Sequence, residues 1–302
     1  ATMITSKEQI IDYFKSGIKD TKDFRIGIEH EKFLFNNKNN QRVDYSKIKQ
    51  MFEALFEFGW NPILENKNII GLNKGGKNIT LEPGNQIELS GEKLNHLHEA
   101  CAESQDYLFE LRQVTQKLDI NIVSAGFDPI SKLDEIPNNP KQRYKLMTKD
   151  MPLGGELSLD MMYRTCGTQL NLDYKSEDDF IKKFKIVNSI VPISIALFAN
   201  SAIVEKKKSN YLSYRSKVWQ NTSRGGLPKI FFEELNFEKY AEFVMNFPIL
   251  FIQNKDTYIS GQKYIFKDFM DGKIDEISNR LPTVNDLTTH LSTIFTENRL
   301  KK

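Results

Sequence analysis

Cysteine is scarce in this 302-residue chain, which contains only Cys101 and Cys166. Two cysteines cannot build a disulfide framework, and free thiols are typical of a reducing cytoplasm. Cys101 falls on the apolar face of an expected helix, where we expect it to be a small core residue. Histidine is also rare, and His96 and His98 are two residues apart, so they cannot chelate one ion from one helix face. These absences exclude a secreted disulfide scaffold and disfavour zinc chemistry.

Long apolar runs and a strong net charge are absent as well. The longest apolar stretch, residues 190–199, contains Pro192 and is too short to span a membrane. Residues 1–16 lack the basic-then-apolar order of a signal peptide. The 42 basic and 40 acidic residues leave a net charge of +2, which indicates neither nucleic acid nor a membrane surface as a partner. We therefore expect a cytoplasmic protein.

What the chain has in quantity is apolar residues arranged in both helical and strand patterns. The 21 Phe and 11 Tyr, with 39% hydrophobic residues, are typical of a globular protein. Helical spacing marks residues 45–58, 93–118 and 176–200, and alternating segments lie between them. Residues 71–78 nearly match a phosphate-binding loop, but a strand pattern follows them, so they predict a hairpin turn. The sequence predicts an α+β fold, a mostly antiparallel sheet with flanking helices, in one domain over residues 1–302.

Two expected strand segments carry pairs of carboxylates. Alternation places Glu29 and Glu31 on one face of the first segment, and Glu82 and Glu88 lie around a Pro83-Gly84 break in the second. If the segments pair, the four carboxylates repel one another unless a divalent cation neutralises them. Oxygen ligands without cysteine or clustered histidine suit Mg²⁺ or Mn²⁺. The spacing favours such a metal cluster and a structural ion-pair network about equally.

Two arginines occur in runs that alternate as strands do. Arg164 lies within residues 159–174, which we expect to form one strand, with a bulge at Gly167. Arg215 lies among aromatic residues in the strand-like run 211–219. A guanidinium in such a place clamps a carboxylate or a phosphoryl group, or else forms an ordinary ion pair with the glutamates.

Five segments in collinear order resemble a known family. They extend over nearly the whole chain and are Gly27-Ile-Glu-His-Glu-Lys-Phe33, Leu81-Glu-Pro-Gly-Asn-Gln-Ile-Glu-Leu-Ser-Gly91, Leu159-Asp-Met-Met-Tyr-Arg-Thr-Cys166, Ala196-Leu-Phe-Ala-Asn-Ser201 and Tyr211-Leu-Ser-Tyr-Arg-Ser216. Together these segments resemble the plant and proteobacterial type of glutamate–cysteine ligase. The resemblance implies a curved, mostly antiparallel sheet like that of glutamine synthetase.

The resemblance also implies an activity, the first step of glutathione biosynthesis. In this family the side-chain carboxylate of glutamate takes the γ-phosphoryl group of ATP, and the amine of cysteine attacks the acyl phosphate to give γ-glutamylcysteine. ATP is the co-substrate, and Mg²⁺ or Mn²⁺ is the metal cofactor. Carried over by motif, the expected residues are the metal ligands Glu29, Glu31, Glu82 and Glu88, the catalytic Arg164 and Arg215, and the substrate- or nucleotide-binding Met162, Tyr163, Gln169, Asn171, Tyr214 and Trp219.

The chain departs from the family at its C-terminal end. Members of the family continue into a further strand that would add a glutamate and an arginine to the site. We therefore expect residues 1–302 to be a truncated catalytic-type domain with weakened or no activity. Two alternatives stay open, a ligase that joins glutamate to another amine and a non-catalytic nucleotide- or amino-acid-binding protein. The expected partners are the small molecules glutamate, cysteine and ATP.

Overall fold

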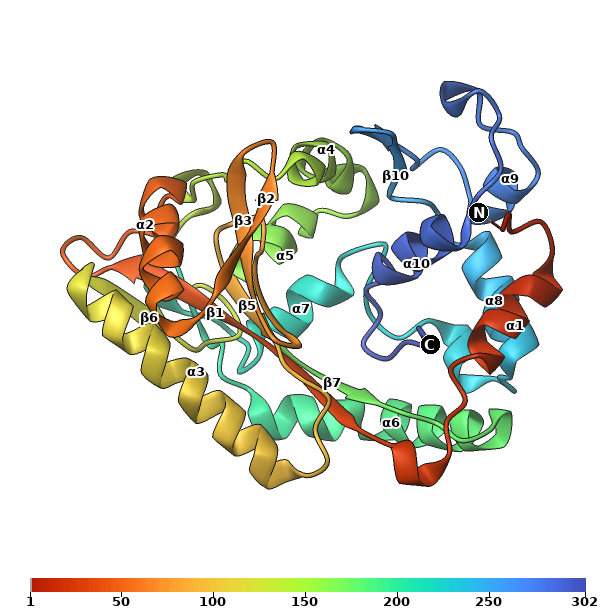
Figure 1. Ribbon diagram of the computed structural model, residues 1–302, viewed down its shortest axis with the longest axis horizontal. Helices are drawn as coiled ribbons and strands as arrows, with labels where there is room; N and C mark the ends of the chain where they lie inside the picture. Colours follow the sequence, from red (N-terminus) through yellow and green to blue (C-terminus); the bar gives the residue numbers. More distant parts are fainter. Residues whose placement is uncertain (1) are drawn as a thin grey trace.

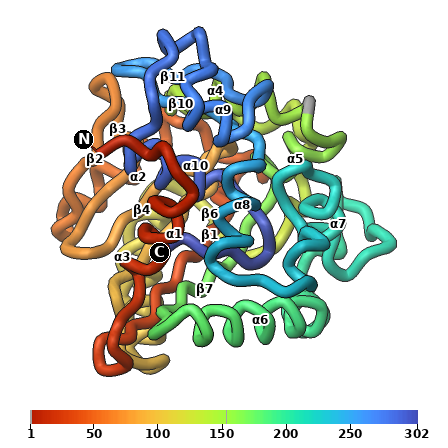
Figure 2. Tube along the Cα trace, turned by 90° about the vertical axis from the view of Figure 1, so that its right-hand side faces the viewer, coloured from red at the N-terminus to blue at the C-terminus, as the bar shows by residue number. Residues whose placement is uncertain are grey.

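The computed structural model describes residues 2–302, which form an antiparallel sheet flanked by helices (Figure 1). Helices α2 (Tyr45–Leu55) and α3 (Leu97–Lys117) cover one side of this sheet, and most of the later helices gather beyond its other side. The long helix α6 (Glu177–Phe198) runs beside strand β7, as both Figure 1 and Figure 2 show. The architecture confirms the predicted α+β class.

The main sheet is built around its longest strand, β1. The spatial order is β2-β3-β4-β5-β1-β6, with β7 also pairing with β1, and every pairing is antiparallel. One edge of β1 pairs with β5, and its other edge pairs first with β7 and then with β6. The strands are β1 (Ile26–Asn36), β2 (Asn61–Glu65), β3 (Asn68–Lys74), β4 (Lys77–Leu81), β5 (Ile87–Ser90), β6 (Ile120–Val123) and β7 (Thr168–Leu172).

Alternation along the strands decides what each face of the sheet carries. On β5, Ile87 and Leu89 are fully buried against α2 and α3, so Glu88 between them points to the opposite face. On β1, Leu34 belongs to the same core, and Glu31 therefore faces away from it. This core also contains Ile48, Met51, Phe52, Leu55, Leu72, Ile79, Leu81, Tyr107, Leu111 and Val114. One face of the sheet is thus apolar, and the other is left for charged groups.

The helices beyond the sheet enclose a second core that is rich in aromatic residues. Tyr240 lies at its centre and contacts the rings of Phe14, Phe180, Phe184 and Phe231. Helix starts in this part are capped by side chains, for example by Ser176, whose hydroxyl accepts from the Asp179 amide at the start of α6. The helices are α1 (Lys7–Lys15), α8 (Phe237–Asn246), α9 (Phe266–Met270) and α10 (Val284–Ser292), together with part of α6.

Short helices and a hairpin connect these two parts. They share a third core around Phe127, Met161, Met162 and Val218. The elements are α4 (Gln142–Asp150), α5 (Ser158–Arg164), α7 (Tyr214–Gln220), the hairpin β10 (Phe251–Asn254) and β11 (Thr257–Ser260), and the two-residue strands β8 (Ile203–Val204) and β9 (Lys207–Lys208). Three of the elements that carry the candidate site, α4, α5 and α7, belong to this group.

Several predicted turns and helix ends are confirmed. The near-match to a phosphate-binding loop is the hairpin turn between β3 and β4, where Gly75 has φ of +61°. Gly59, with φ of +87°, ends the short helical turn that follows α2. In both places only glycine adopts the left-handed backbone without strain.

Residues 159–174 do not form the single strand that their alternation predicts. The segment Ser158–Arg164 is helix α5, and only Thr168–Leu172 is strand. Within α5, Arg164 pairs with Asp160 one turn earlier at 2.8 Å, which supports a helix. Alternation misleads here because consecutive residues are all buried, namely Met161, Met162 and Tyr163. A helix buried on several sides leaves no periodic pattern to read.

Two further predictions are corrected by the structure. Arg215 lies in helix α7 instead of a strand, because Ser213 caps the start of that helix by accepting from the Ser216 amide at 3.3 Å. Cys101 is exposed on α3, although we expected a core position. Helix α3 turns Tyr107 and Leu111 toward the sheet, and this orientation places Cys101 on the solvent side.

Helix α6 buries less of its apolar surface than its composition suggests. Ile186, Ile190, Ile193 and Leu197 are 50%, 45%, 59% and 73% exposed, respectively. They recur every three or four residues and therefore form one stripe along the helix. The buried residues of α6 lie on its opposite side, toward the aromatic core.

Candidate active site

The structure brings three of the four predicted carboxylates together. Glu31 on β1 and Glu88 on β5 are directly opposite in the strand register, and Glu82 lies in the turn that joins β4 to β5. Each contributes a carboxylate oxygen, and these oxygens all lie within 4.8 Å of one another. We call Glu31, Glu82 and Glu88 the acidic cluster. Its formation confirms that the two acidic segments pair in one sheet.

Loss of hydration and mutual repulsion raise the pKa values of two members of the acidic cluster, Glu31 and Glu88. Burial raises the pKa of Glu31, and the neighbouring Glu82 raises it further. Burial also raises the pKa of Glu88, with added repulsion from Glu82, Glu31 and Glu29. The nearby guanidinium of Arg215 acts in the opposite direction and lowers the pKa of Glu31. Without a cation, these raised pKa values favour the protonated forms of Glu31 and Glu88 at neutral pH.

Glu29 lies beside the acidic cluster and is held by neutral side chains. Its carboxylate accepts from the side-chain amide of Gln169, from Asn171 Nδ2 at 3.2 Å and from Ser90 Oγ at 3.2 Å. Gln169 is the direct partner of Glu29 across the β1–β7 pair, so the strand register brings these two side chains together. Both amides donate to Glu29, and therefore they orient this carboxylate.

Of the two predicted arginines, Arg215 is the one directed at the acidic cluster. It passes so close to Gly167 that a Cβ there would lie 2.5 Å from its Nη2. The Gly167 amide donates to Glu31 Oε2 at 2.7 Å, so the arginine and the carboxylate meet at this glycine. The guanidinium also lies 5.3 Å from the ring of Trp219, and its Nε has no hydrogen-bond partner among the described residues. Arg164 Nε also lacks a partner, and what distinguishes Arg215 is that it forms no ion pair within 4.0 Å among the described residues.

Arg164 is occupied by protein groups. Its guanidinium donates to Asp160 at 2.8 Å and to Glu205 at 3.3 Å, and it stacks 4.6 Å from the ring of Phe127. The side chain is 7% exposed, so these acidic groups neutralise most of its field. In this arrangement Arg164 joins α5 to the loop that carries Glu205.

The predicted aromatic and methionine residues differ in their surroundings. Met162 and Tyr163 are buried in the third core, and the Tyr163 hydroxyl bonds to Thr148 at 2.6 Å and to Asn138 at 2.7 Å. Tyr214 is partly buried and lies edge-on to Phe127, with ring centroids 4.8 Å apart. The structure thus places Met162 and Tyr163 in the scaffold behind the acidic cluster.

Sequence reasoning missed the groups that hold the turn carrying Glu82. Arg42 donates to the carbonyl oxygens of Gly84 and of Tyr163, the latter at 3.1 Å, and pairs with Asp128 at 2.9 Å. From the other side, Asn139 donates to the Glu82 carbonyl oxygen at 2.9 Å. No spacing rule connects residues so far apart in sequence. The only local signal was the Pro-Gly break, which marks a turn whose backbone needs outside partners.

A second missed group comes from the C-terminal residues. Arg299 donates to Gln169 Oε1 at 3.0 Å and to the carbonyl oxygens of Ser292 and Ile294 at 3.2 Å and 2.8 Å. Because an arginine only donates, it turns the amide nitrogen of Gln169 toward Glu29. Arg299 therefore acts on Glu29 through Gln169.

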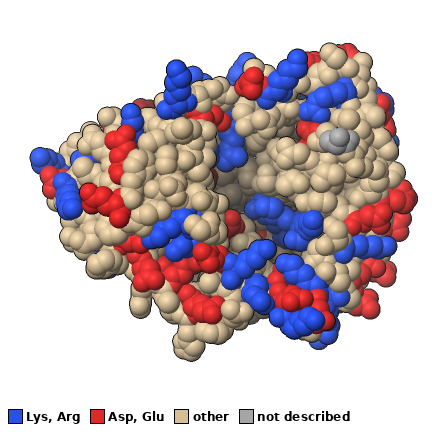
Figure 3. All heavy atoms as spheres, in the orientation of Figure 1, with Lys and Arg blue, Asp and Glu red and all other residues tan. Residues whose placement is uncertain are grey.

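The acidic cluster fits a hard divalent cation. Its donors are carboxylate oxygens from Glu31, Glu82 and Glu88, and oxygen ligands are what Mg²⁺ and Mn²⁺ prefer. Like charges at this separation are stable only with protons or a cation between them. Figure 3 shows a hollow between the sheet side and the helical side of the molecule, with lysine and arginine side chains around it. An anionic ligand that carries a cation suits these surroundings.

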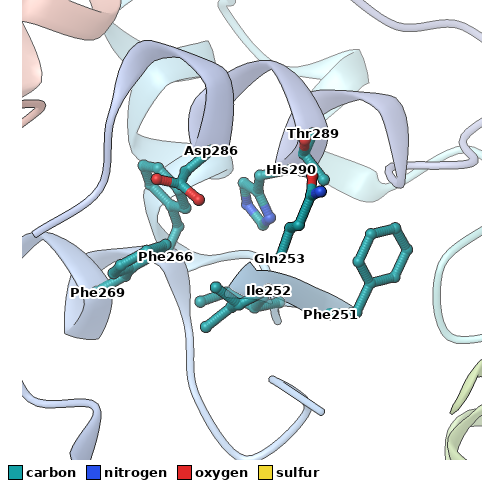
Figure 4. Close-up of a pocket in the computed structure, with 9 residues that line it drawn as sticks. Phe251, Ile252, Gln253, Phe266, Phe269, Asp286, Thr289 and His290 are labelled. Atoms are coloured by element: carbon teal, nitrogen blue, oxygen red, sulfur yellow. The ribbon is translucent and has the colours of Figure 1, made fainter. Parts of the chain in front are cut away.

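A small cavity in the helical part does not form a comparable site. It has a volume of about 10 Å³, enough for one water molecule, and lies between β10, α9 and α10 (Figure 4). His290 lines it, stacks on Phe266 and places Nε2 2.8 Å from the Val244 carbonyl oxygen. Burial lowers the pKa of His290 to about 3, so this imidazole is neutral. The cavity belongs to the core.

Among residues 2–302, the structure contains no helix with both the length and the apolar character needed to cross a membrane.

Comparison with known proteins identifies related sequences over the whole chain. The chain is 42% identical over 306 residues to a chloroplastic glutamate–cysteine ligase of Medicago truncatula, covering 100% of this chain and 60% of the relative. It is 42% identical over 301 residues to glutamate–cysteine ligase A of Oryza sativa subsp. japonica, covering 98% and 61%. For the Arabidopsis thaliana enzyme the identity is 40% over 306 residues, covering 100% and 59%. The chain thus spans about 60% of the length of the curated relatives that it matches.

The expectation of a cytoplasmic location is wrong, because these relatives are named as chloroplastic enzymes. Two free cysteines were not enough to infer a cytoplasmic location. Unpaired cysteines indicate reducing conditions, and they do not identify which reducing compartment provides them.

The strongest comparison is with a family model. The model for glutamate-cysteine ligase family 2 (GCS2) matches residues 25–302, a range that includes the acidic cluster, Glu29, Arg164 and Arg215. The family resemblance read from the five sequence segments is therefore confirmed. The chain belongs to glutamate-cysteine ligase family 2.

Proposed function

We propose that this chain contributes the glutamate-activating site of an ATP-dependent ligase that joins glutamate to cysteine. The observation that carries the proposal is the acidic cluster beside Arg215 in a chain of this family. Carboxylates that repel one another in the absence of a cation suit a site that binds a metal–nucleotide complex. The names of the relatives supply the acceptor, cysteine, and the product would be γ-glutamylcysteine.

In this proposal the carboxylates hold Mg²⁺ or Mn²⁺. Glu31, Glu82 and Glu88 would be direct ligands, and Glu29 would be a ligand oriented by Gln169 and Asn171. When bound, the cation would offset the negative charge of the nucleotide phosphates. The protein's contribution is a fixed set of oxygens, because two strands and one turn set the positions of these side chains.

Arg215 would meet the carboxylate of glutamate or the transferring phosphoryl group. Its guanidinium is stacked on Trp219 and lies beside Gly167, so it can meet an anion without leaving the acidic cluster. Arg164 would support this arrangement from behind, since Asp160 and Glu205 already engage it. Tyr214, next to Arg215 on α7, would form a wall of the substrate pocket.

The proposal is tested by measuring phosphate release from ATP by this chain with Mg²⁺, glutamate and a panel of amines. We expect release that depends on both Mg²⁺ and glutamate and is greatest with cysteine. Arg215→Met should lower release by at least tenfold, because the charge that meets the anion is lost. Arg112→Met, the same substitution at an exposed position on helix α3, is the matched control. Equal release with and without glutamate would contradict the proposal, and nucleotide binding without release would favour a binding function.

A further inference from the structure

The segment that enters α4 reaches the backbone just before Glu82. The Tyr144 hydroxyl donates to the Leu81 carbonyl oxygen at 2.6 Å, and Lys141 Nζ donates to the same oxygen at 3.1 Å. Asn139 Nδ2 donates to the Glu82 carbonyl oxygen at 2.9 Å. We call Asn139, Lys141 and Tyr144 the Leu81 clamp. All three side chains are buried, at 8%, 6% and 5% exposure.

Lys141 brings a positive charge to this clamp. Among residues 2–302 it forms no ion pair within 4.0 Å, although it is buried. Its ammonium instead bonds to the Leu81 carbonyl oxygen and to the Tyr144 hydroxyl at 3.2 Å. Burial and the neighbouring Arg143 lower the pKa of Lys141 to about 8, and the carboxylates of Glu82 and Glu88, which lie beyond ion-pair distance, act in the opposite direction and favour its charged form. The Leu81 clamp and the acidic cluster are therefore electrostatically connected.

Glu82 depends on outside contacts more than its neighbours do. Glu31 and Glu88 lie on paired strands, whose ladder of backbone hydrogen bonds fixes them. Glu82 lies in a turn closed by its own amide, which donates to the Gln86 carbonyl oxygen at 2.8 Å, and Asn85 adopts a left-handed φ of +62°. The position of this carboxylate thus follows from what holds the turn.

We propose that the Leu81 clamp positions Glu82 for cation binding, so that Asn139, Lys141 and Tyr144 are positioning residues of the acidic cluster. The inference rests on the proposed function in taking this cluster as the cation site. Groups that orient a metal ligand typically change metal affinity by about 10–100-fold when they are lost. The clamp acts on the backbone next to one ligand and not on the ligand itself, so the loss of a single bond should have an effect at or below the lower end of this range.

A matched pair of tyrosine substitutions tests the inference. Tyr144→Phe removes one hydroxyl that donates to a strand carbonyl in the Leu81 clamp. Tyr45→Phe removes a hydroxyl that donates to the Ile69 carbonyl oxygen at 2.9 Å, on the far part of the sheet. A hydroxyl that donates to a strand carbonyl is lost in both variants, Tyr144→Phe also removes the oxygen to which Lys141 Nζ donates at 3.2 Å, and neither variant changes the formal charge. Calorimetric titration with Mn²⁺ alone, together with thermal unfolding, is carried out on both variants and on the unsubstituted chain.

We expect Mn²⁺ to bind the Tyr144→Phe chain about threefold to tenfold more weakly, and the Tyr45→Phe chain with unchanged affinity. Adding Asn139→Ala to Tyr144→Phe should weaken binding by more than tenfold. A purely structural role predicts lower melting temperatures for both single variants and equal Mn²⁺ affinities, and that result would overturn the inference alone. Absence of Mn²⁺ binding by the unsubstituted chain would overturn the proposed cation site and this inference with it.

Discussion

Two networks of buried charge meet at the turn that joins β4 to β5, and they have opposite character. The acidic cluster brings together like charges, and burial together with their mutual repulsion raises the pKa values of Glu31 and Glu88. The pair Arg42–Asp128 joins opposite charges at 2.9 Å, with side chains only 1% and 0% exposed. Arg42 is also bonded to two backbone carbonyl oxygens, and Asp128 accepts from the amides of Ile130 and Ser131.

The two networks differ in what their charges do: the Arg42–Asp128 pair stabilises the fold, whereas the acidic cluster is suited to binding a ligand. A buried ion pair that also hydrogen-bonds to backbone groups fixes the backbone around it, and removing one partner leaves the other charge uncompensated. Among the described residues the acidic cluster has no cationic partner within 4.0 Å, so in its ionised form it destabilises the folded chain until a cation or protons bind. The same turn depends on the first network for its shape, and through Glu82 it contributes a ligand to the second.

The largest effect is expected from breaking the structural pair. Arg42→Met leaves Asp128 buried without its partner, so the free energy of unfolding should fall by about 3–5 kcal/mol. Urea denaturation measures this change. The double variant Arg42→Met/Asp128→Leu should recover at least half of the loss, because no charge then remains buried. A double variant no more stable than Arg42→Met would show that the pair is not the source of the effect.

The acidic cluster should respond in the opposite way. Glu88→Gln removes one of the repelling charges, so the metal-free chain should be as stable as the unsubstituted chain or more stable. The same substitution removes a ligand, and Mn²⁺ affinity should fall at least tenfold. Thermal unfolding with and without Mn²⁺ measures both effects. If Glu88→Gln lowers the stability of the metal-free chain by as much as Arg42→Met does, the distinction between the two networks fails.

The pH dependence of stability should reveal the acidic cluster. In the folded chain the pKa is raised to about 8 for Glu31 and to about 9 for Glu88, against about 4.3 for an ordinary glutamate. Between these values the folded state binds more protons than the unfolded state, so this contribution to stability is present at low pH and is lost as pH rises toward 9. Urea denaturation from pH 5 to 9 should show a decline that is smaller in Glu88→Gln. An identical decline in the two chains would contradict the assignment.

The smallest effect is expected at a half-exposed ion pair. Lys74 contacts Glu110 at 2.6 Å, and Glu110 also accepts from the Trp60 indole at 2.8 Å. The lysine and glutamate side chains are 31% and 16% exposed, so water screens their attraction. Lys74→Met should cost less than about 1 kcal/mol by urea denaturation. A loss equal to that of Arg42→Met would mean that burial does not set the size of these effects.

The sequence by itself determined the face on which each strand residue lies. The alternating pattern of the sequence places Glu88 opposite Ile87 and Leu89 and puts Gln169 on one face with Asn171, and the structure has the same grouping. These patterns are readable because a strand has a fixed two-residue period and one face of this sheet is buried. The motifs then connected the groups to a family before any distance between them was available.

Only the tertiary structure decided which groups hold the site. Arg42 and Asp128 are 86 residues apart in the chain, and no local pattern links them. Arg164 is drawn into ion pairs whereas Arg215 points to the acidic cluster, although both arginines occur in similar runs. The apolar stripe of α6 is a further example. Its composition favours burial, but the stripe is exposed because tertiary packing decides which apolar side chains are covered. Local periodicity sets the direction of a side chain, and long-range contacts set its partner.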